Sequence, residues 1–204
     1  MSLKEKFERD FETYPQEFGL DLHKEEDQFK WFLASVLFAK RISAKIAKKT
    51  YREFEKEDLT TPDSIIEAGW DKLVEVLDKG GYTRYDESTA TNLIELSKKL
   101  KEEYGSIGNL YQQATSKTDL EKKLKDFKGV GPTTVNIFLR DMRPIWDYAR
   151  PKISPPGEKM AQKLGIEDKE DIKELEPYLV KIYLELCKNK KCEECLAREY
   201  CPGK

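Results

Sequence analysis

The chain has 204 residues, enough for one compact domain or two small lobes, and 37% of them are charged. Its net charge is −2, so no overall positive field draws it to nucleic acid, and any DNA binding must use a local basic patch. The N-terminus has no apolar signal-peptide core and the longest apolar run is too short to span a membrane, so we expect a soluble, cytoplasmic protein.

Apolar residues recur at helical spacing along most of the chain, and no run of alternating β-branched residues demands a strand. Lys and Glu dominate the charges, a compositional hint of a thermophilic prokaryote. The pattern predicts an all-α protein of about ten short helices. The expected helices cover residues 30–48, 61–68, 71–77, 87–104, 109–114, 119–127, 157–164 and 169–186.

A Gly-x-Gly turn separates two helical patterns at Phe127-Lys128-Gly129-Val130-Gly131-Pro132-Thr133-Thr134-Val135-Asn136. Proline is favoured at the first helical position, and two glycines let the backbone take positive φ and pass close to a bulky partner. The amides after the turn would then meet an anion at a helix N-terminus, for which a phosphate diester is the natural guest. An ordinary corner between two helices with a glycine cap is the alternative. The predicted DNA contacts here are Gly129, Val130, Gly131, Thr133 and Thr134.

All four cysteines lie near the C-terminus in the pattern Cys187-x4-Cys192-x2-Cys195-x5-Cys201. One contiguous run with these gaps favours an iron–sulfur cluster, because zinc sites with four cysteines usually use two separated Cys-x2-Cys pairs. Zinc, free thiols and disulfides stay open as alternatives. The basic residues Lys188, Lys190 and Lys191 lie between the first two cysteines, where they could contact phosphate or form a solvated charged loop.

The hairpin and the cysteines, in this order, resemble the endonuclease III family of DNA glycosylases. That family has a hairpin like Leu-Pro-Gly-Val-Gly-Arg-Lys-Thr-Ala-Asn, a later Val-Asp-Thr-His segment and a Cys-x6-Cys-x2-Cys-x5-Cys cluster. Here the middle segment reads Trp146-Asp147-Tyr148-Ala149, and the last two cysteine gaps are identical. The likeness covers about residues 26–204.

The resemblance implies a two-lobed helix-hairpin-helix DNA glycosylase fold with a C-terminal four-cysteine cluster loop. One lobe would be a six-helix bundle of residues 26–142 that ends in the hairpin. The other would join residues 1–25 to residues 143–204 and hold a [4Fe-4S] cluster, with zinc as the alternative. Double-stranded DNA would lie between the lobes, a base would be flipped out, and we expect a monomer.

The resemblance implies that Asp147 is the catalytic carboxylate, since breaking a glycosidic bond builds positive charge on the sugar. An N-cap or turn aspartate is the plain alternative, and Asp141 is the second candidate. Members that also cleave the strand carry a hairpin lysine, and Thr133 stands at its place. A hydroxyl cannot form the imine of a lyase, so we expect no efficient lyase activity.

Other positions also depart from the family's pattern. Lys40 stands where the family has a glutamine facing the base, so it could contact the opposite strand or a phosphate; an ordinary surface lysine after an apolar helix is the alternative. Trp146 and Tyr148 could stack on a base or belong to the core. His23, the only histidine, has no expected catalytic role. Prolines between residues 150 and 156 replace the helix expected after the aspartate.

The sequence therefore predicts a monofunctional DNA N-glycosylase of base-excision repair. The main alternative is a catalytically impaired helix-hairpin-helix protein that binds DNA and keeps a structural cluster. A metal-sensing or redox module is a third hypothesis.

Overall fold

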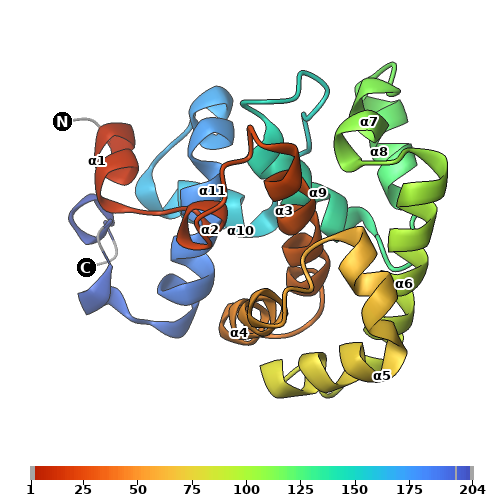
Figure 1. Ribbon diagram of the computed structural model, residues 1–204. Helices are drawn as coiled ribbons and strands as arrows, with labels where there is room; N and C mark the ends of the chain where they lie inside the picture. The colour runs from red at the N-terminus through yellow and green to blue at the C-terminus, as the bar shows by residue number, and fades with distance from the viewer. Residues whose placement is uncertain (1–2, 196, 203–204) are drawn as a thin grey trace. The chain divides into compact units, whose positions relative to one another are not determined.

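The computed structural model describes residues 3–195 and 197–202, and all the regular structure within them is helical, which confirms the predicted class (Figure 1). Contacts divide the chain into two compact units, Met1–Gly19 with Pro151–Lys204, and Leu20–Arg150. The sequence predicts breaks after residues 25 and 142, and the contact division falls after residues 19 and 150.

The larger unit contains the hairpin. Its helices are α3 (Glu25–Phe38), α4 (Ala44–Lys56), α5 (Pro62–Gly80), α6 (Asp86–Glu103), α7 (Ile107–Gln112), α8 (Lys117–Lys125) and α9 (Pro132–Met142). Helix α5 joins two segments that the sequence predicts as separate helices. The join is a kink at Gly69, whose φ of 73° lies in the region that favours glycine.

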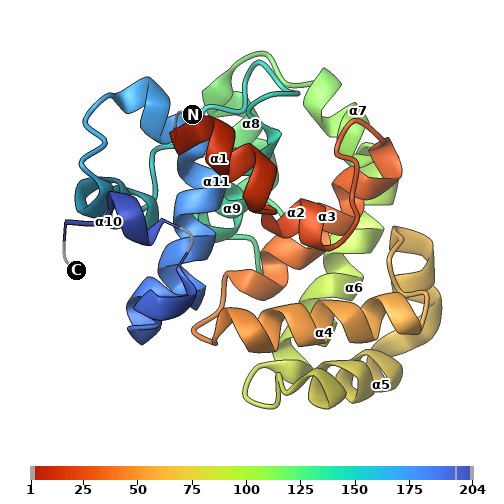
Figure 2. The same cartoon turned by 90° about the vertical axis from the view of Figure 1, so that its left-hand side faces the viewer.

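Helix α3 is largely buried, and it packs against α4, α7 and α9 (Figures 1 and 2). Apolar residues surround most of this helix, which is typical of a buried helix. The ring of Phe32 contacts Phe127 at 6.0 Å and Phe138 at 5.1 Å between centroids. One buried ring therefore holds both sides of the hairpin, because Phe127 precedes the glycine turn and Phe138 follows it.

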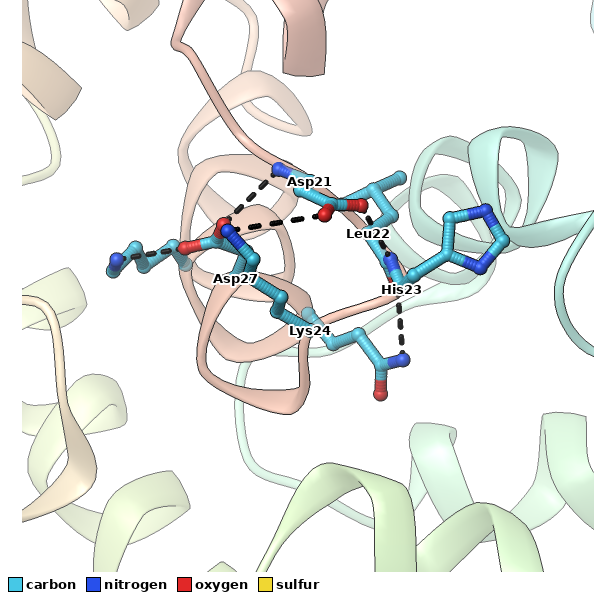
Figure 3. Close-up of polar contacts among 7 residues, drawn as sticks. Asp21, Leu22, His23, Lys24 and Asp27 are labelled. Atoms are coloured by element: carbon cyan, nitrogen blue, oxygen red, sulfur yellow. Dashed lines mark hydrogen bonds and ion pairs between the residues drawn. The ribbon is translucent and has the colours of Figure 1, made fainter.

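The chain enters α3 through a polar turn built around Asp27 (Figure 3). The Asp27 carboxylate accepts hydrogen bonds from the Asp21 backbone N–H at 3.0 Å and from Lys30 Nζ at 2.7 Å. Burial disfavours the charged carboxylate, but these two bonds outweigh it and hold the pKa of Asp27 below its usual range. The imidazole of His23 points away from this carboxylate.

Helix α4 packs closely on α5, and a hydrogen bond nearby links the loop after α5 to the end of α3 (Figure 2). A Cβ at Gly80 would lie 2.3–2.7 Å from atoms of Thr50, so only glycine permits this approach. Gly81 follows in the left-handed conformation, and the Tyr82 hydroxyl then donates to the Leu37 carbonyl at 2.8 Å. This buried bond ties the loop after α5 to the end of α3, just before Lys40.

The smaller unit has its own apolar core. Its helices are α1 (Leu3–Asp10), α2 (Tyr14–Glu17), α10 (Pro155–Leu164) and α11 (Lys169–Glu185), followed by the short 3-10 helices η1 (Cys187–Asn189), η2 (Cys192–Glu194) and η3 (Arg198–Tyr200). Phe7 of α1 packs with residues of α10 and α11, among them Met160 and Leu179. Among the described residues, no helix combines the length and the apolar character needed to cross a bilayer.

One expectation about the prolines is wrong. The sequence predicts irregular chain through Pro155 and Pro156, but α10 begins at Pro155. The first turn of a helix has no acceptors for its amides, so prolines cost nothing there. The Ser154 backbone N–H, just before this helix, donates to the buried Glu176 carboxylate at 2.6 Å.

Candidate functional site

The hairpin turn lies between α8 and α9. Phe127 and Val130 are buried, while Lys128 and Gly129 are exposed. Gly129 has a φ of 79°, and a Cβ there would also lie 2.6–2.9 Å from the Asn92 side chain. Both observations require glycine at this position.

Gly131 has an extended backbone, with a φ of −105° and a ψ of −178°. Of the two glycines that permit a positive φ, Gly129 adopts one. A Cβ at Gly131 would meet nothing within 4 Å. The protein's own packing therefore does not require glycine here, whereas close approach of an external backbone would.

Gly131 is also the N-cap of α9, and it has no side chain that could cap the helix. The first amide with a backbone acceptor is that of Val135, which donates to the Gly131 carbonyl at 3.1 Å. Within the described chain, the Gly131 and Thr133 amides have no hydrogen-bond acceptor. Thr133 is exposed and Gly131 half-buried, whereas Thr134 is buried. The accessible donors are thus the Gly131 and Thr133 amides, at the positive end of the helix dipole.

In the same unit, Lys40 from the loop after α3 and Arg84 from the loop after α5 both lie near the aromatic ring of Tyr85. Lys40 Nζ lies 6.0 Å from the centroid of the Tyr85 ring, and the Arg84 guanidinium lies 5.5 Å from it. In the part of the chain that the structure describes, neither cation has a carboxylate within 4.0 Å. Lys128 is different, because its Nζ is paired with Glu95 of α6 at 2.7 Å.

Asp147 lies in the segment that follows α9, and its side chain is exposed. Its backbone N–H donates to the Tyr111 hydroxyl at 3.0 Å. Among the described residues, no hydrogen bond or ion pair engages its carboxylate. Asp141, the second candidate, is buried in the last turn of α9 and paired with Arg140 at 3.1 Å. The free carboxylate is therefore that of Asp147.

The two aromatic residues beside Asp147 differ in exposure. Trp146 is 3% exposed, and its ring lies parallel to that of Tyr111, with centroids 4.5 Å apart. The Trp146 ring also makes an edge contact with Phe138, with the ring centroids 5.4 Å apart. Trp146 therefore belongs to the core. Tyr148 is 36% exposed and remains the accessible ring of this segment.

The four cysteines lie in the smaller unit, and none forms a disulfide. Cys187, Cys195 and Cys201 pack against the apolar core of this unit, whereas Cys192 is exposed. Burial raises the pKa of the Cys195 thiol, against a hydrogen bond from the Ala197 backbone, and the other three thiols raise it further.

The described part of the cysteine segment, residues 187–201, does not form a complete binding site for a metal ion. Across residues 3–195 and 197–202, no three His, Cys, Asp or Glu side chains are placed so that they could hold a metal ion. Of the lysines between the first two cysteines, Lys191 is 3.1 Å from Glu194, whereas Lys188 and Lys190 are exposed.

Sequence reasoning missed three residues of this region. Tyr111 binds the Asp147 backbone, Arg84 joins Lys40 at Tyr85, and Arg150 Nη1 donates to the carbonyls of Arg143 and Ala149. No sequence signal could have found them, since each acts on a residue or carbonyl whose position depends on the tertiary fold.

No protein-family model matches the chain, and no curated protein matches it either. Among solved structures, the chain is similar to the 3-methyladenine DNA glycosylase MagIII of H. pylori, crystallised with 1,N6-ethenoadenine. The two chains are 19% identical, the similarity covers 84% of this chain and 79% of that one, and the TM-score is 0.48. Function therefore has to be argued from this chain's own residues.

The two hairpin glycines should respond differently to substitution by alanine. Gly129→Ala should cost about 2 kcal/mol or more, because it combines a left-handed conformation with a clash against Asn92. Gly131→Ala should cost less than about 1 kcal/mol, the usual loss at a helix N-cap. Denaturant midpoints of both variants check this, and equal losses would contradict the backbone conformations described above.

Proposed function

We propose that this protein is a monofunctional DNA N-glycosylase of base-excision repair that acts on a damaged or mismatched base in double-stranded DNA. The observation that carries the proposal is the helix start at Gly131. Its accessible amides have no acceptor within the described chain, and the open space beside it would admit a phosphodiester backbone. The same unit supplies a free carboxylate at Asp147.

The grip would be independent of sequence, since amides that bind phosphate oxygens read no base edges. Lys40 and Arg84 would add positive charge without forming the acidic pairs that neutralise most lysines of this chain. Lys188 and Lys190 are exposed cations of the smaller unit that suit the same partner. Neutralised phosphates release counterions, so binding should weaken steeply as salt rises.

The chemistry assigned to Asp147 is electrostatic and general-base catalysis. As the bond between C1′ and the base nitrogen breaks, the leaving base takes the bonding electrons and the sugar becomes cationic. The Asp147 carboxylate would stabilise that charge and orient a water, whose oxygen then bonds to C1′. The proton released from this water neutralises the anionic base, so the products are the free base and an abasic site.

The residues of the hairpin support base release without strand cleavage. A lyase step needs an amine that can attack C1′, and Thr133 offers only a hydroxyl. Lys128, the nearest lysine in the turn, is exposed but paired with Glu95. Neither side chain supplies a free amine to the abasic sugar.

We also propose that Cys187, Cys192, Cys195 and Cys201 hold a [4Fe-4S] cluster. The donor set fits, because it has four unbridged thiols, of which three pack against one apolar core. When bound, the cluster would cross-link the segment after α11. The pairing of Lys6 with Glu199 already ties this segment to α1.

Asp147→Asn should abolish base release while DNA binding persists. We expect wild type to release one of uracil, mismatched thymine, oxidised pyrimidines, 8-oxoguanine or alkylated purines, and the variant to do so at least about 100-fold more slowly. Single-turnover assays on these oligonucleotides measure the rates. Borohydride should trap no covalent adduct on abasic DNA.

Asp78→Asn is the matched control, because Asp78 is an exposed aspartate of the same unit and the change in charge is the same. This control should release base at the wild-type rate. If wild type binds DNA but releases no base from any of these lesions, the protein is the catalytically impaired DNA-binding alternative.

Gly131→Ala should weaken duplex binding about fivefold or more, because its new methyl group would stand where the phosphate backbone approaches. Thr133→Ala is the control, since it keeps the backbone amide and removes only the hydroxyl. Fluorescence anisotropy across a salt series measures both affinities. Equal losses in the two variants, or affinity that ignores salt, would contradict a grip made by amides.

Protein purified without oxygen should be brown and contain about four irons and about four inorganic sulfides per chain. Cys195→Ser should lose this colour and iron, because it removes one ligand. Metal and sulfide analysis checks both. One zinc per chain with no sulfide would establish the zinc alternative instead.

A further inference from the structure

We infer that Tyr111 is a positioning residue, which fixes the segment Trp146–Tyr148 and with it the carboxylate of Asp147. The inference rests on the proposed function, since it assigns to Asp147 the chemistry described above. Tyr111 precedes Asp147 by 36 positions in the sequence. It belongs to neither the hairpin nor the cysteine segment.

Tyr111 contacts each of three consecutive residues. Its hydroxyl oxygen accepts the Asp147 backbone N–H at 3.0 Å. Its ring stacks on Trp146 with an interplanar angle of 3°, and it meets Tyr148 edge to face, with centroids 6.1 Å apart. One side chain therefore contacts the backbone of Asp147 and the rings of both its neighbours.

The helix that carries Tyr111 is firmly held. Ser106 caps α7 by accepting the Asn109 backbone N–H at 3.1 Å, and Ile107 and Leu110 are buried beneath it. Helix α7 packs against α3 and α8. A short helix with these anchors can serve as a fixed point for a segment that has no regular structure of its own.

Turn hydrogen bonds hold the two neighbours of Asp147, since the Trp146 N–H donates to the Met142 carbonyl and the Tyr148 carbonyl accepts the Arg150 N–H, both at 2.9 Å. Arg150 holds carbonyls on either side of Asp147, at Arg143 and Ala149. The Asp147 amide itself is held by Tyr111. Rotation of this peptide would swing the attached carboxylate, and misplacing a catalytic group by about 1 Å can cost about 100-fold in rate.

A residue that only fills space would not need its hydroxyl, and this difference gives the test. Tyr111→Phe keeps the ring and removes the acceptor, whereas Tyr111→Leu removes the stacking as well. We expect Tyr111→Phe to slow single-turnover base release about tenfold, while DNA affinity and thermal midpoint stay close to wild type. Tyr111→Leu should slow base release further. Tyr183→Phe, which removes a hydroxyl from α11 of the smaller unit, should leave the rate unchanged.

Exchange of the Asp147 amide with solvent deuterium, followed by NMR, supplies a readout that needs no activity. Tyr111→Phe should speed this exchange about tenfold, because the amide loses its acceptor. Unchanged exchange would overturn the positioning role, as would base release at the wild-type rate. If wild type releases no base, the proposed function fails, while the exchange measurement still decides whether Tyr111 holds the segment.

Discussion

The structure of the larger unit depends on one buried ring, that of Phe32, which contacts both Phe127 and Phe138. These two rings lie on opposite sides of the glycine turn, so burying them against α3 fixes the entry and the exit of the hairpin together. Across Gly129, the Val130 backbone N–H donates to the Phe127 carbonyl at 3.1 Å. The amides at Gly131 and Thr133 remain outside this core, where a ligand can reach them.

The same core extends to the candidate carboxylate. Phe138 touches Trp146, and Trp146 stacks on Tyr111, so α9 and α7 enclose the residue next to Asp147. The proposed DNA-binding turn and the proposed catalytic carboxylate are thereby attached to one set of packed aromatic rings. Among the described residues the Asp147 carboxylate has no partner, which suits the role proposed for it against a cationic sugar.

The smaller unit ends in a segment with little regular structure of its own. Its last segment contains three short 3-10 helices, which supply few hydrogen bonds and little buried surface. Half-buried cysteines and the pairing of Lys6 with Glu199 attach this segment to the apolar core. A metal cluster would replace the packing that so short a segment cannot provide.

The sequence alone determined the helical class, most helix positions, the site of the turn and the four clustered thiols, because periodicity, glycine, proline and cysteine act locally. It was wrong about Pro155, since a proline that would break a helix interior is tolerated in the first turn of a helix. Only the tertiary structure separated Asp147 from Asp141, placed Trp146 in the core and left Tyr148 exposed. The contacts of Tyr111 with Asp147 and of Lys40 with Tyr85 join positions more than thirty residues apart, and no local pattern encodes them. Long-range packing brought these side chains together.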